Sequence, residues 1–543
     1  MKRGSIIPIA VMALLLLALQ SPVMAQGPNP MRVGPEFSGQ WYNPGQPGHG
    51  LLLEVLPGGQ AFGAWFVFDD MGNPMWMVGM GRISGSDMTL DMQALSGGRF
   101  PPHFDAGAVQ RTDWGTLVVH FDGCSSATLS WDSRLVRFGS GSMALRRLTS
   151  IDQLGCGQIA AWGNDLAYVA DQIRSLHPDP FHVLPEAAFD GRVENLRQRL
   201  AGMPEELVPV AVAELLASLG DAHTTLMLPV RGMRHYPLQL SRVREGLIVT
   251  AAETGFEDLL GRRLMAIDGV TVADMETSLA RVISHENPYW VEAMSPGYMM
   301  IPEVQVYLGH VENPDMARFR FQSIDGDVVA RDIPSMPFEE SPDWHGIFER
   351  PDFTAPTYMT RDDDYWYRYM DQSHTIYLSY HRARQMPGMS FNDMAQQIEA
   401  FSSMHPVDRV IVDLRFNHGG NSSIMESFIE GIPNSPFNSP ERLFVLIGRD
   451  TFSSGLINAL ELRQKTHATL VGGPTGGKPD HFGEVRQFAM PSSGFLVTYS
   501  TRRFTMVGND AMASLVPDLY VNDPSWLAFL HGEDPCLEAV GAF

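Results

Sequence analysis

Three short loops in the C-terminal third of the chain combine residue types that could carry out acyl transfer. The first ends an apolar run with Gly419-Gly420 before a predicted helix, and unpaired backbone N–H groups in such a turn bind a phosphate or a tetrahedral oxyanion. The second places Ser453 and Ser454 between an apolar strand and the next helix, and the third presents Lys478 after two glycines. An oxyanion cradle, a hydroxyl nucleophile and a base are the parts that nucleophilic catalysis requires.

Lysine is rare in this chain, so its position is informative. The 39 residues that are Lys or Arg include only three lysines, Lys2, Lys465 and Lys478. Arginine cannot act as a base because its pKa lies above about 12, whereas a lysine can when burial lowers its pKa. Each loop also has a plainer interpretation: a Gly pair as a turn, a serine as a helix N-cap, and Lys478 as a surface residue. The combination favours chemistry.

The elements around these loops follow an α/β pattern. Apolar strands alternate with helical segments, which predicts a largely parallel sheet with crossover helices. Functional sites in such sheets form where strands run into helices. The predicted strands are 376–380, 409–414, 443–447, 469–472 and 495–500, and the predicted helices are 391–401, 422–432 and 454–463.

Five short pieces, in this order, resemble the tail-specific or C-terminal processing serine proteases and their tricorn relatives. They are Leu219-Gly-Asp-Ala-His223, Val412-Asp-Leu-Arg-x-Asn-x-Gly-Gly420, Thr451-Phe-Ser453-Ser-Gly, Gly476-Gly-Lys478-Pro and Val516-Pro-Asp518. The resemblance runs from about residue 165 to 521 and implies a crotonase-like α/β catalytic core. It assigns Ser453 as nucleophile, Lys478 as general base, and the amide of Ser454 with Gly419 or Gly420 as oxyanion hole.

The sequence departs from the processing proteases in one respect that leaves two candidate bases. The Gly-Asp-Ala-His223 loop is closer to the tricorn branch, where the matching histidine is the base and a further Ser and Glu orient it. Here Ala222 replaces that Ser, and Asp510 is the nearest acid where that Glu is expected. Lys478 is the preferred base; His223 is the alternative, or it orients, or it is a structural histidine.

The remaining chain is predicted to form further modules, which makes the protein a multidomain α+β chain. Residues 36–156 hold five of the ten tryptophans between frequent turns, which predicts an all-β module. This segment resembles a β-rich module of secreted bacterial proteins. Residues 259–270 resemble part of a PDZ domain. The predicted organisation is 1–25 signal peptide, 36–156 Trp-rich β module, 157–235 helical subdomain, 236–335 PDZ-like α+β subdomain, 336–374 connecting segment and 375–530 α/β serine peptidase core.

The N-terminus predicts export. A Lys-Arg start, an apolar run over residues 6–19 and Ala25 before a plausible cut are typical of a cleaved signal peptide. No later run is long and apolar enough to span a membrane, so we expect a mature chain without membrane insertion, periplasmic or extracellular. In that compartment Cys124 and Cys156 are expected to form a disulfide, with Cys536 unpaired.

Composition excludes several classes of partner. The formal net charge of −23 disfavours nucleic-acid binding. The 17 histidines are scattered without a His-Glu-x-x-His run, and there is no Gly-x-Ser-x-Gly elbow. We therefore expect no metal, no cofactor and no common esterase fold.

The predicted function is an exported serine endopeptidase that hydrolyses peptide bonds of unstructured polypeptides through an acyl-enzyme. The alternative is a catalytically inactive binding protein on the same fold, which the presence of both Ser453 and Lys478 disfavours. Tryptophan in a small β module usually belongs to the core. Exposed tryptophan in the β module could instead bind a glycan or a cell surface.

Overall fold

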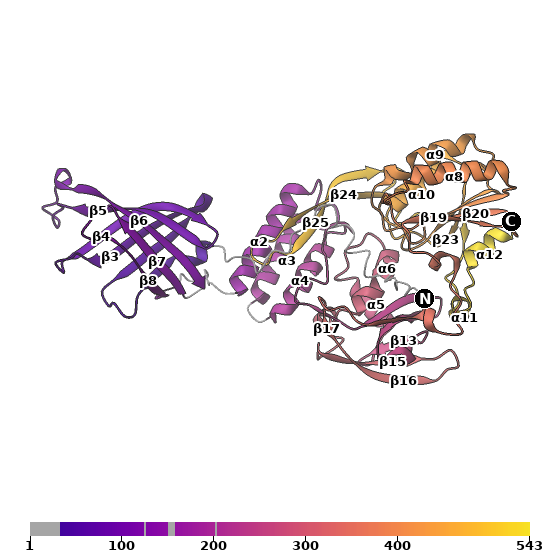
Figure 1. Ribbon diagram of the computed structural model, residues 1–543, viewed down its shortest axis with the longest axis horizontal. Coiled ribbons are helices and arrows are strands. Elements are labelled where there is room, and N and C mark those ends of the chain that lie inside the picture. The colour runs from indigo at the N-terminus through magenta and orange to yellow at the C-terminus, as the bar shows by residue number, and fades with distance from the viewer. Residues whose placement is uncertain (1–32, 124–125, 150–157, 201–202, 543) are drawn as a thin grey trace. The chain divides into compact units, whose positions relative to one another are not determined.

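A computed structural model describes residues 33–123, 126–149, 158–200 and 203–542 of the 543-residue chain (Figure 1). These residues form two compact units, a larger one of residues 169–489 and 495–543 and a barrel unit of residues 33–168 with 490–494. The predicted signal peptide and the predicted Cys124–Cys156 disulfide lie outside the described residues. Within the described ranges, no helix is both long and apolar enough to cross a membrane.

The barrel unit holds a closed antiparallel barrel in which β1 pairs with β8 (Figure 1). Alternate side chains point inward along each strand, and Trp41, Trp65 and Trp114 lie buried in the interior. The all-β prediction for this segment is confirmed, with these three tryptophans in the core. The strands are β1 (Gly39–Tyr42), β2 (Gly50–Leu56), β3 (Gln60–Phe68), β4 (Pro74–Ser84), β5 (Asp87–Ser96), β6 (Gln110–Gly123), β7 (Ser126–Ser133) and β8 (Ser140–Arg147).

Three helices follow the barrel: α2 (Gln158–Leu176), α3 (Glu186–Arg199) and α4 (Val208–Ala217). Apolar residues fill almost every position of α4, and nearly the whole helix is buried. The chain then turns at Gly220, whose φ of 71° suits a residue without Cβ. The polar loop that follows, residues 221–224, leads into β9 (Thr225–Leu226).

An α+β layer comes next. Its main sheet has the order β11-β12-β13-β15-β16. The Asp268-Gly269 turn joins β13 to β14 with positive φ at both residues, as a tight hairpin requires. The elements are β11 (Leu238–Val243), β12 (Gly246–Glu253), β13 (Arg263–Ile267), β14 (Val270–Thr271), α5 (Val272–Leu279), α6 (Pro288–Met299), α7 (Pro302–Tyr307), β15 (Met316–Gln322), β16 (Val328–Pro334) and β18 (Trp344–Gly346), with a separate pair β10 (Arg234–His235) and β17 (Met336–Pro337).

The C-terminal layer is a six-stranded sheet of order β19-β20-β21-β22-β23-β26, parallel except for the edge strand β19. Alternate residues of its strands pack against α8, α9 and α10 on one face and against α12 on the other, which makes three layers. The elements are β19 (Tyr365–Met370), β20 (Thr375–Tyr380), α8 (Phe391–Met404), β21 (Arg409–Asp413), α9 (Glu426–Gly431), β22 (Leu443–Ile447), α10 (Ser454–Lys465), β23 (Thr469–Gly472), β26 (Leu519–Tyr520), α11 (Trp526–Leu530) and α12 (Pro535–Gly541).

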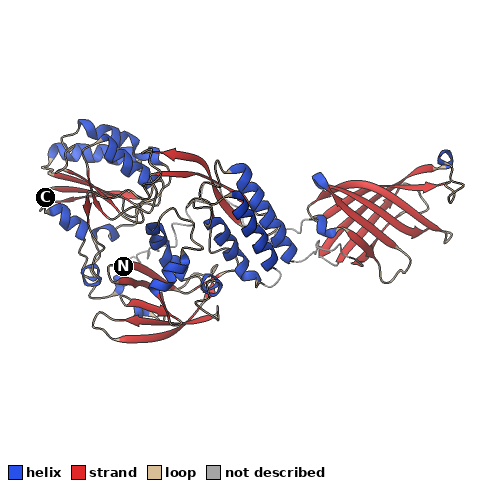
Figure 2. Cartoon of the chain, turned by 180° about the vertical axis from the view of Figure 1, so that it is seen from behind, coloured by secondary structure: helices blue, strands red, loops and turns tan. Residues whose placement is uncertain are grey.

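The strand expected at 495–500 is not part of this parallel sheet. It belongs to β25 (Leu496–Thr505), which pairs antiparallel with β24 (Asp480–Ala489) and with β9. The long hairpin extends from the C-terminal layer toward the helices (Figures 1 and 2). Sequence reasoning placed 495–500 in the parallel sheet because the apolar pattern of a strand does not identify its partner strand. The short β26 forms the edge of that sheet instead.

Candidate active site

Ser453 lies at the turn between β22 and α10 in a conformation that serine rarely adopts. Its φ is 51°, in the left-handed region that disfavours residues with a Cβ. Such strain is concentrated at functional sites. Ser453 occupies the N-cap position of α10, but its side chain makes no capping hydrogen bond, so capping does not account for its hydroxyl. Among the described residues its hydroxyl has no hydrogen-bond partner, which leaves it available for chemistry.

The Gly419-Gly420 backbone lies directly against Ser453. The φ values of Gly419 and Gly420 are 116° and 132°, and a Cβ on Gly419 would lie 2.7 Å from Ser453 Cβ. The Gly419 N–H already donates to Asn417 Oδ1 at 2.9 Å. The Gly420 and Ser454 N–H groups donate to none of the described residues, so both are free to bind an anion.

Asn417 and Ser454 hold this arrangement together. Asn417 is fully buried, donates to the Tyr380 carbonyl at 2.8 Å, and accepts the Phe452 N–H on its own carbonyl at 2.9 Å. The Ser454 hydroxyl donates to the Gly420 carbonyl at 2.7 Å. The ends of β20, β21 and β22 are thereby joined at one edge of the sheet, which is where parallel α/β sheets place their sites.

Lys478 follows β23 in a loop packed against the Ser453 turn. The Gly477 N–H donates to the Thr451 carbonyl at 3.1 Å, and a Cβ on Gly477 would lie 2.7 Å from the Leu456 side chain. Lys478 is partly buried, and its ammonium forms no hydrogen bond or ion pair with a described residue, Ser453 included. Its charge lowers the pKa values of Glu286 and Asp510, so it faces both acids.

His223 packs beside the nucleophile candidate. Its ring stacks on Phe452, the residue before Ser453, with centroids 4.6 Å apart, and on His481 at 5.7 Å. Neither ring nitrogen has a hydrogen-bond partner among the described residues. Burial lowers the pKa of His223 to about 4, although the Asp221 carboxylate opposes this. The imidazole is therefore neutral at neutral pH, and a hydrogen-bonded structural histidine does not describe it.

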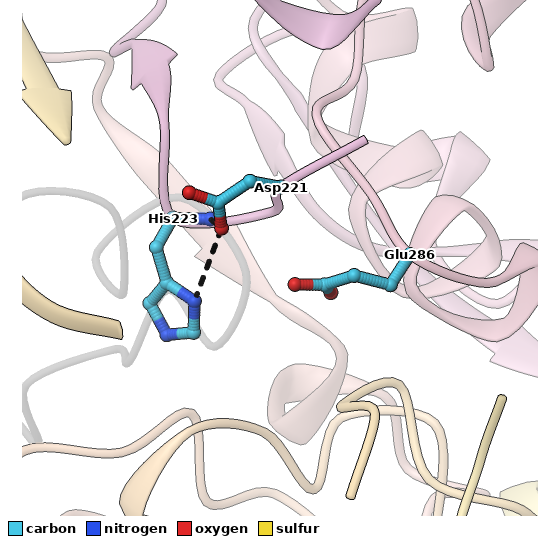
Figure 3. Close-up of side chains that lie close together, drawn as sticks. All are labelled: Asp221, His223 and Glu286. Atoms are coloured by element: carbon cyan, nitrogen blue, oxygen red, sulfur yellow. Dashed lines mark hydrogen bonds and ion pairs between the residues drawn. The ribbon is translucent and has the colours of Figure 1, made fainter. Parts of the chain in front are cut away.

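Asp221 is a buried carboxylate held from several sides. It accepts hydrogen bonds from His177 Nε2 at 3.0 Å, from the Thr224 and Ser500 hydroxyls at 2.5 and 2.7 Å, and from the His223 N–H at 3.0 Å. Burial alone would raise the pKa of Asp221, but these donors and the His223 ring lower it to about 2. A fixed negative charge thus lies 3.8 Å from His223 Nδ1 (Figure 3).

Sequence reasoning missed Glu286, which points toward the same space as His223 and Asp221 (Figure 3). Its Oε1 accepts the Ala222 N–H at 3.2 Å, and its Oε2 is buried without a partner. Burial and the Asp221 charge raise the pKa of Glu286 to about 8, against the opposing effect of Lys478. No sequence spacing relates Glu286 to His223, because only the tertiary fold brings the two together.

Asn287 and Trp290, which follow Glu286 in the chain, contact the Lys478 loop and the Ser453 turn. The Asn287 amide donates to the carbonyls of Gly476 at 2.9 Å and Ala513 at 2.8 Å. Trp290, in the first turn of α6, stacks on Phe452 with centroids 3.9 Å apart. Asp510, the acid that the sequence suggested for orienting the histidine, instead pairs with Arg503 and is exposed.

The comparisons with known proteins concern the family and the fold. Residues 378–521 match the family model described as peptidase family S41. A search of curated proteins finds no match. Among solved structures, a serine-to-alanine mutant of CPAF is 11% identical at a TM-score of 0.50, over 71% of this chain and 97% of that chain. At this identity the likeness shows the fold alone.

Two further solved structures are similar at lower TM-scores. Mature CPAF complexed with lactacystin is 12% identical at a TM-score of 0.49, over 71% of this chain and 97% of that chain. The tricorn protease is 12% identical at a TM-score of 0.34, over 93% of this chain and 63% of that chain.

Proposed function

We propose that this chain, whose residues 378–521 match the peptidase family S41 model, is a serine endopeptidase acting on unstructured polypeptides through Ser453. The observation that supports this most directly is the strained Ser453, whose hydroxyl lies free against Gly419. The free N–H groups of Gly420 and Ser454 are the oxyanion donors in this proposal. Donors of this kind are worth about 10²–10³ in rate each.

We propose His223 as the general base, with Lys478, the base that the sequence favoured, as the alternative. A base needs a lone pair at working pH, and the neutral, unpartnered imidazole beside Phe452 offers one. Neither Lys478 nor His223 makes a hydrogen bond with Ser453, so the choice between them rests on the neutral imidazole. The Asp221 carboxylate would stabilise the imidazolium that forms when His223 accepts a proton.

The proposed reaction proceeds in two transfers. His223 takes the Ser453 proton as Ser453 Oγ attacks the peptide carbonyl carbon. The resulting oxyanion accepts hydrogen bonds from the Gly420 and Ser454 N–H groups. The imidazolium then gives its proton to the leaving amine, which departs and leaves an ester on Ser453. Water attacks that ester with His223 again as base, and serine is restored.

Hydrolysis of casein by the purified mature protein, with all of its domains present, tests the proposal. Ser453→Ala should abolish cleavage, whereas Ser403→Ala, on the exposed face of α8, should leave it unchanged. Cleavage that survives in Ser453→Ala would overturn the assignment of the nucleophile. If the unaltered protein and both variants all fail to cleave casein, the result would favour the alternative function, an inactive binding protein.

The finer features of the sequence prediction belong to this proposal as well. We infer that the chain is exported after removal of residues 1–25, that the sheet flanked by α8–α10 and α12 is the crotonase-like core, and that the β11–β16 layer is PDZ-like. Sequencing the N-terminus of the protein recovered from the producing cells tests the first of these. Cleavage of peptides that differ only in a free or an amidated C-terminus tests whether the PDZ-like layer captures a carboxylate.

The barrel also offers a contact surface, which we propose binds a glycan or a cell surface. Phe66 and Trp76 are opposite each other on β3 and β4 and are 49% and 46% exposed, and Phe100 in the β5–β6 loop is 90% exposed. Aromatic rings stack on sugar faces and dock at interfaces. Trp76→Ala should weaken retention on polysaccharide. Trp41 is buried inside the barrel and cannot make a contact of this kind. Equal retention of Trp76→Ala and the unaltered protein would contradict the proposal.

A further inference from the structure

Asp221, His223 and Glu286 bring three electron-pair donors into one small space. One ligand atom from each residue lies within 4.8 Å of the others (Figure 3). The His223 side chain is only 5% exposed, and neither ring nitrogen makes a hydrogen bond of good geometry, although the nearby Phe482 backbone raises its pKa. Glu286 Oε2 is likewise buried without a partner. Buried polar atoms normally have partners, so these three unfilled positions indicate a missing ligand.

Neighbouring groups hold two of the three donors in place. The Asp221 carboxylate is oriented by His177, Thr224 and Ser500, which all donate to Oδ2. Oδ1 accepts only the His223 N–H and keeps a lone pair toward His223 Nδ1, 3.8 Å away. Outer hydrogen bonds of this kind orient the ligating carboxylates of metal sites.

The third donor can complete the site with a small movement. Glu286 Oε1 is anchored by the Ala222 N–H, and the next residue, Asn287, is fixed by the carbonyls of Gly476 and Ala513. Zinc binds nitrogen and oxygen ligands at about 2.0–2.2 Å, so its ligands lie within roughly 3.5 Å of one another. Rotation of the Glu286 carboxyl group, whose Oε2 is unpartnered, can close the remaining gap.

The charge of this space also calls for a cation. Two carboxylates lie side by side, and among the described residues no lysine or arginine forms an ion pair with either of them. Lys478 acts on Glu286 only through its field. Asp221 is paired with His177, but Glu286 Oε2 has no partner, and a buried carboxylate without a partner requires a proton or a metal ion. A mixed nitrogen and oxygen set containing imidazole suits Zn²⁺ rather than Mg²⁺ or Ca²⁺, which prefer oxygen alone.

We propose that Asp221, His223 and Glu286 form a Zn²⁺ site, with one oxygen from each carboxylate and Nδ1 of His223 as ligands. Occupation would switch the peptidase off, a consequence that rests on the proposed role of His223. A neutral imidazole that ligates through Nδ1 carries its proton on Nε2 and has no lone pair left to accept the Ser453 proton. Zinc would displace the proton from Glu286 into solvent, so binding releases protons.

Zinc binding can be measured without any peptidase activity. Tag-free, full-length Ser453→Ala protein is titrated with ZnCl₂ against a chromophoric chelator, and one Zn²⁺ per chain is expected to bind. Adding Glu286→Gln keeps the acceptor for the Ala222 N–H but removes a ligand. It should weaken binding at least tenfold, since changing even an outer-shell partner of a metal ligand weakens binding by about 10–100-fold.

A matched control separates this site from ordinary surface binding. Asp510→Asn removes an exposed acid that also faces Lys478, and it should leave the zinc affinity unchanged. Co²⁺ in place of Zn²⁺ should give a visible absorption band that Glu286→Gln removes, while an unchanged melting temperature shows that this variant is folded. Absence of zinc binding, or equal affinity of Glu286→Gln and its parent, would overturn the proposal whether or not casein is cleaved.

Discussion

At the scale of single residues, the protonation states of the two candidate bases decide how the site works. His223 is buried, and burial lowers its pKa to about 4, so its imidazole is neutral through the physiological range. A lysine must first lose its proton before it can act as a base. The two candidates therefore predict different pH profiles, and the difference can be measured on one protein.

If His223 is the base, kcat/KM should rise with pH as His223 loses its proton near pH 4 and should then stay level through neutrality. Protonation below that pH removes the lone pair that accepts the Ser453 proton. His223→Ala should lower kcat by roughly 10²–10⁴, and Lys478→Ala should have a much smaller effect. The reverse order of the two variants, measured on the same peptide substrate, would make Lys478 the base.

Gly419 should not tolerate a side chain. Its φ is 116°, and a Cβ there would lie 2.7 Å from Ser453 Cβ. Gly419→Ala should displace the nucleophile and lower kcat by about 100-fold, because a shift of 1 Å is enough for such a loss. Gly431→Ala is the matched control, since Gly431 ends α9 with helical φ and nothing near its Cβ position. Full activity in Gly419→Ala would show that the hydroxyl does not depend on this contact.

Sequence reasoning singled out Ser453, Lys478 and the two glycines because each follows a strand in a recognisable local pattern. It singled out His223 because the residue lies in a polar loop after a helix. Glu286 had no such pattern. It lies 65 positions after Asp221 in the chain, and only the fold brings it close to Asp221 and His223. Long-range proximity of this kind cannot be read from spacing along a chain.

At the scale of elements, the turn before α6 connects the His223 loop to the Lys478 loop. Asn287 caps α6 by accepting the Trp290 N–H at 3.1 Å, while its amide donates to the carbonyls of Gly476 and Ala513. The sequence predicted neither contact, although Asn-Pro at 287–288 is a typical helix start. The same limit applied to β25, whose partners β24 and β9 could not be identified from its apolar pattern.

Asn287→Ala should therefore destabilise the larger unit more than loss of a helix cap alone. Removing the cap costs about 0.5–2 kcal/mol, and the buried Gly476 carbonyl left without a donor costs about 1–3 kcal/mol. We expect the free energy of unfolding to fall by about 1.5–5 kcal/mol in urea titrations. Asn195→Ala, on the exposed side of α3, should change it by less than about 0.5 kcal/mol. Equal effects of the two variants would contradict the connecting role of Asn287.

At the scale of the whole molecule, the chain forms two units with separate hydrophobic cores. The all-β character of the segment that forms β1 to β8 could be predicted from turn spacing, but closure of the barrel could not. Closure depends on β1 meeting β8 about a hundred residues later, through the pairs Trp41 with Arg147 and Tyr42 with Arg146. A closed barrel has no free edge strands, and its core contains only its own side chains.

The peptidase chemistry should therefore survive removal of the barrel. Every residue that we assign to the site, with each hydrogen-bond partner named above, lies in the larger unit. A chain that begins at residue 158 keeps Asp165, whose carboxylate accepts the Ser492 and Ser493 N–H groups at 2.7 and 2.8 Å. Such a chain should retain the kcat/KM of the full protein on casein, and residues 33–149 alone should unfold in one cooperative step. A raised KM with unchanged kcat would instead show that the barrel helps to bind the polypeptide substrate.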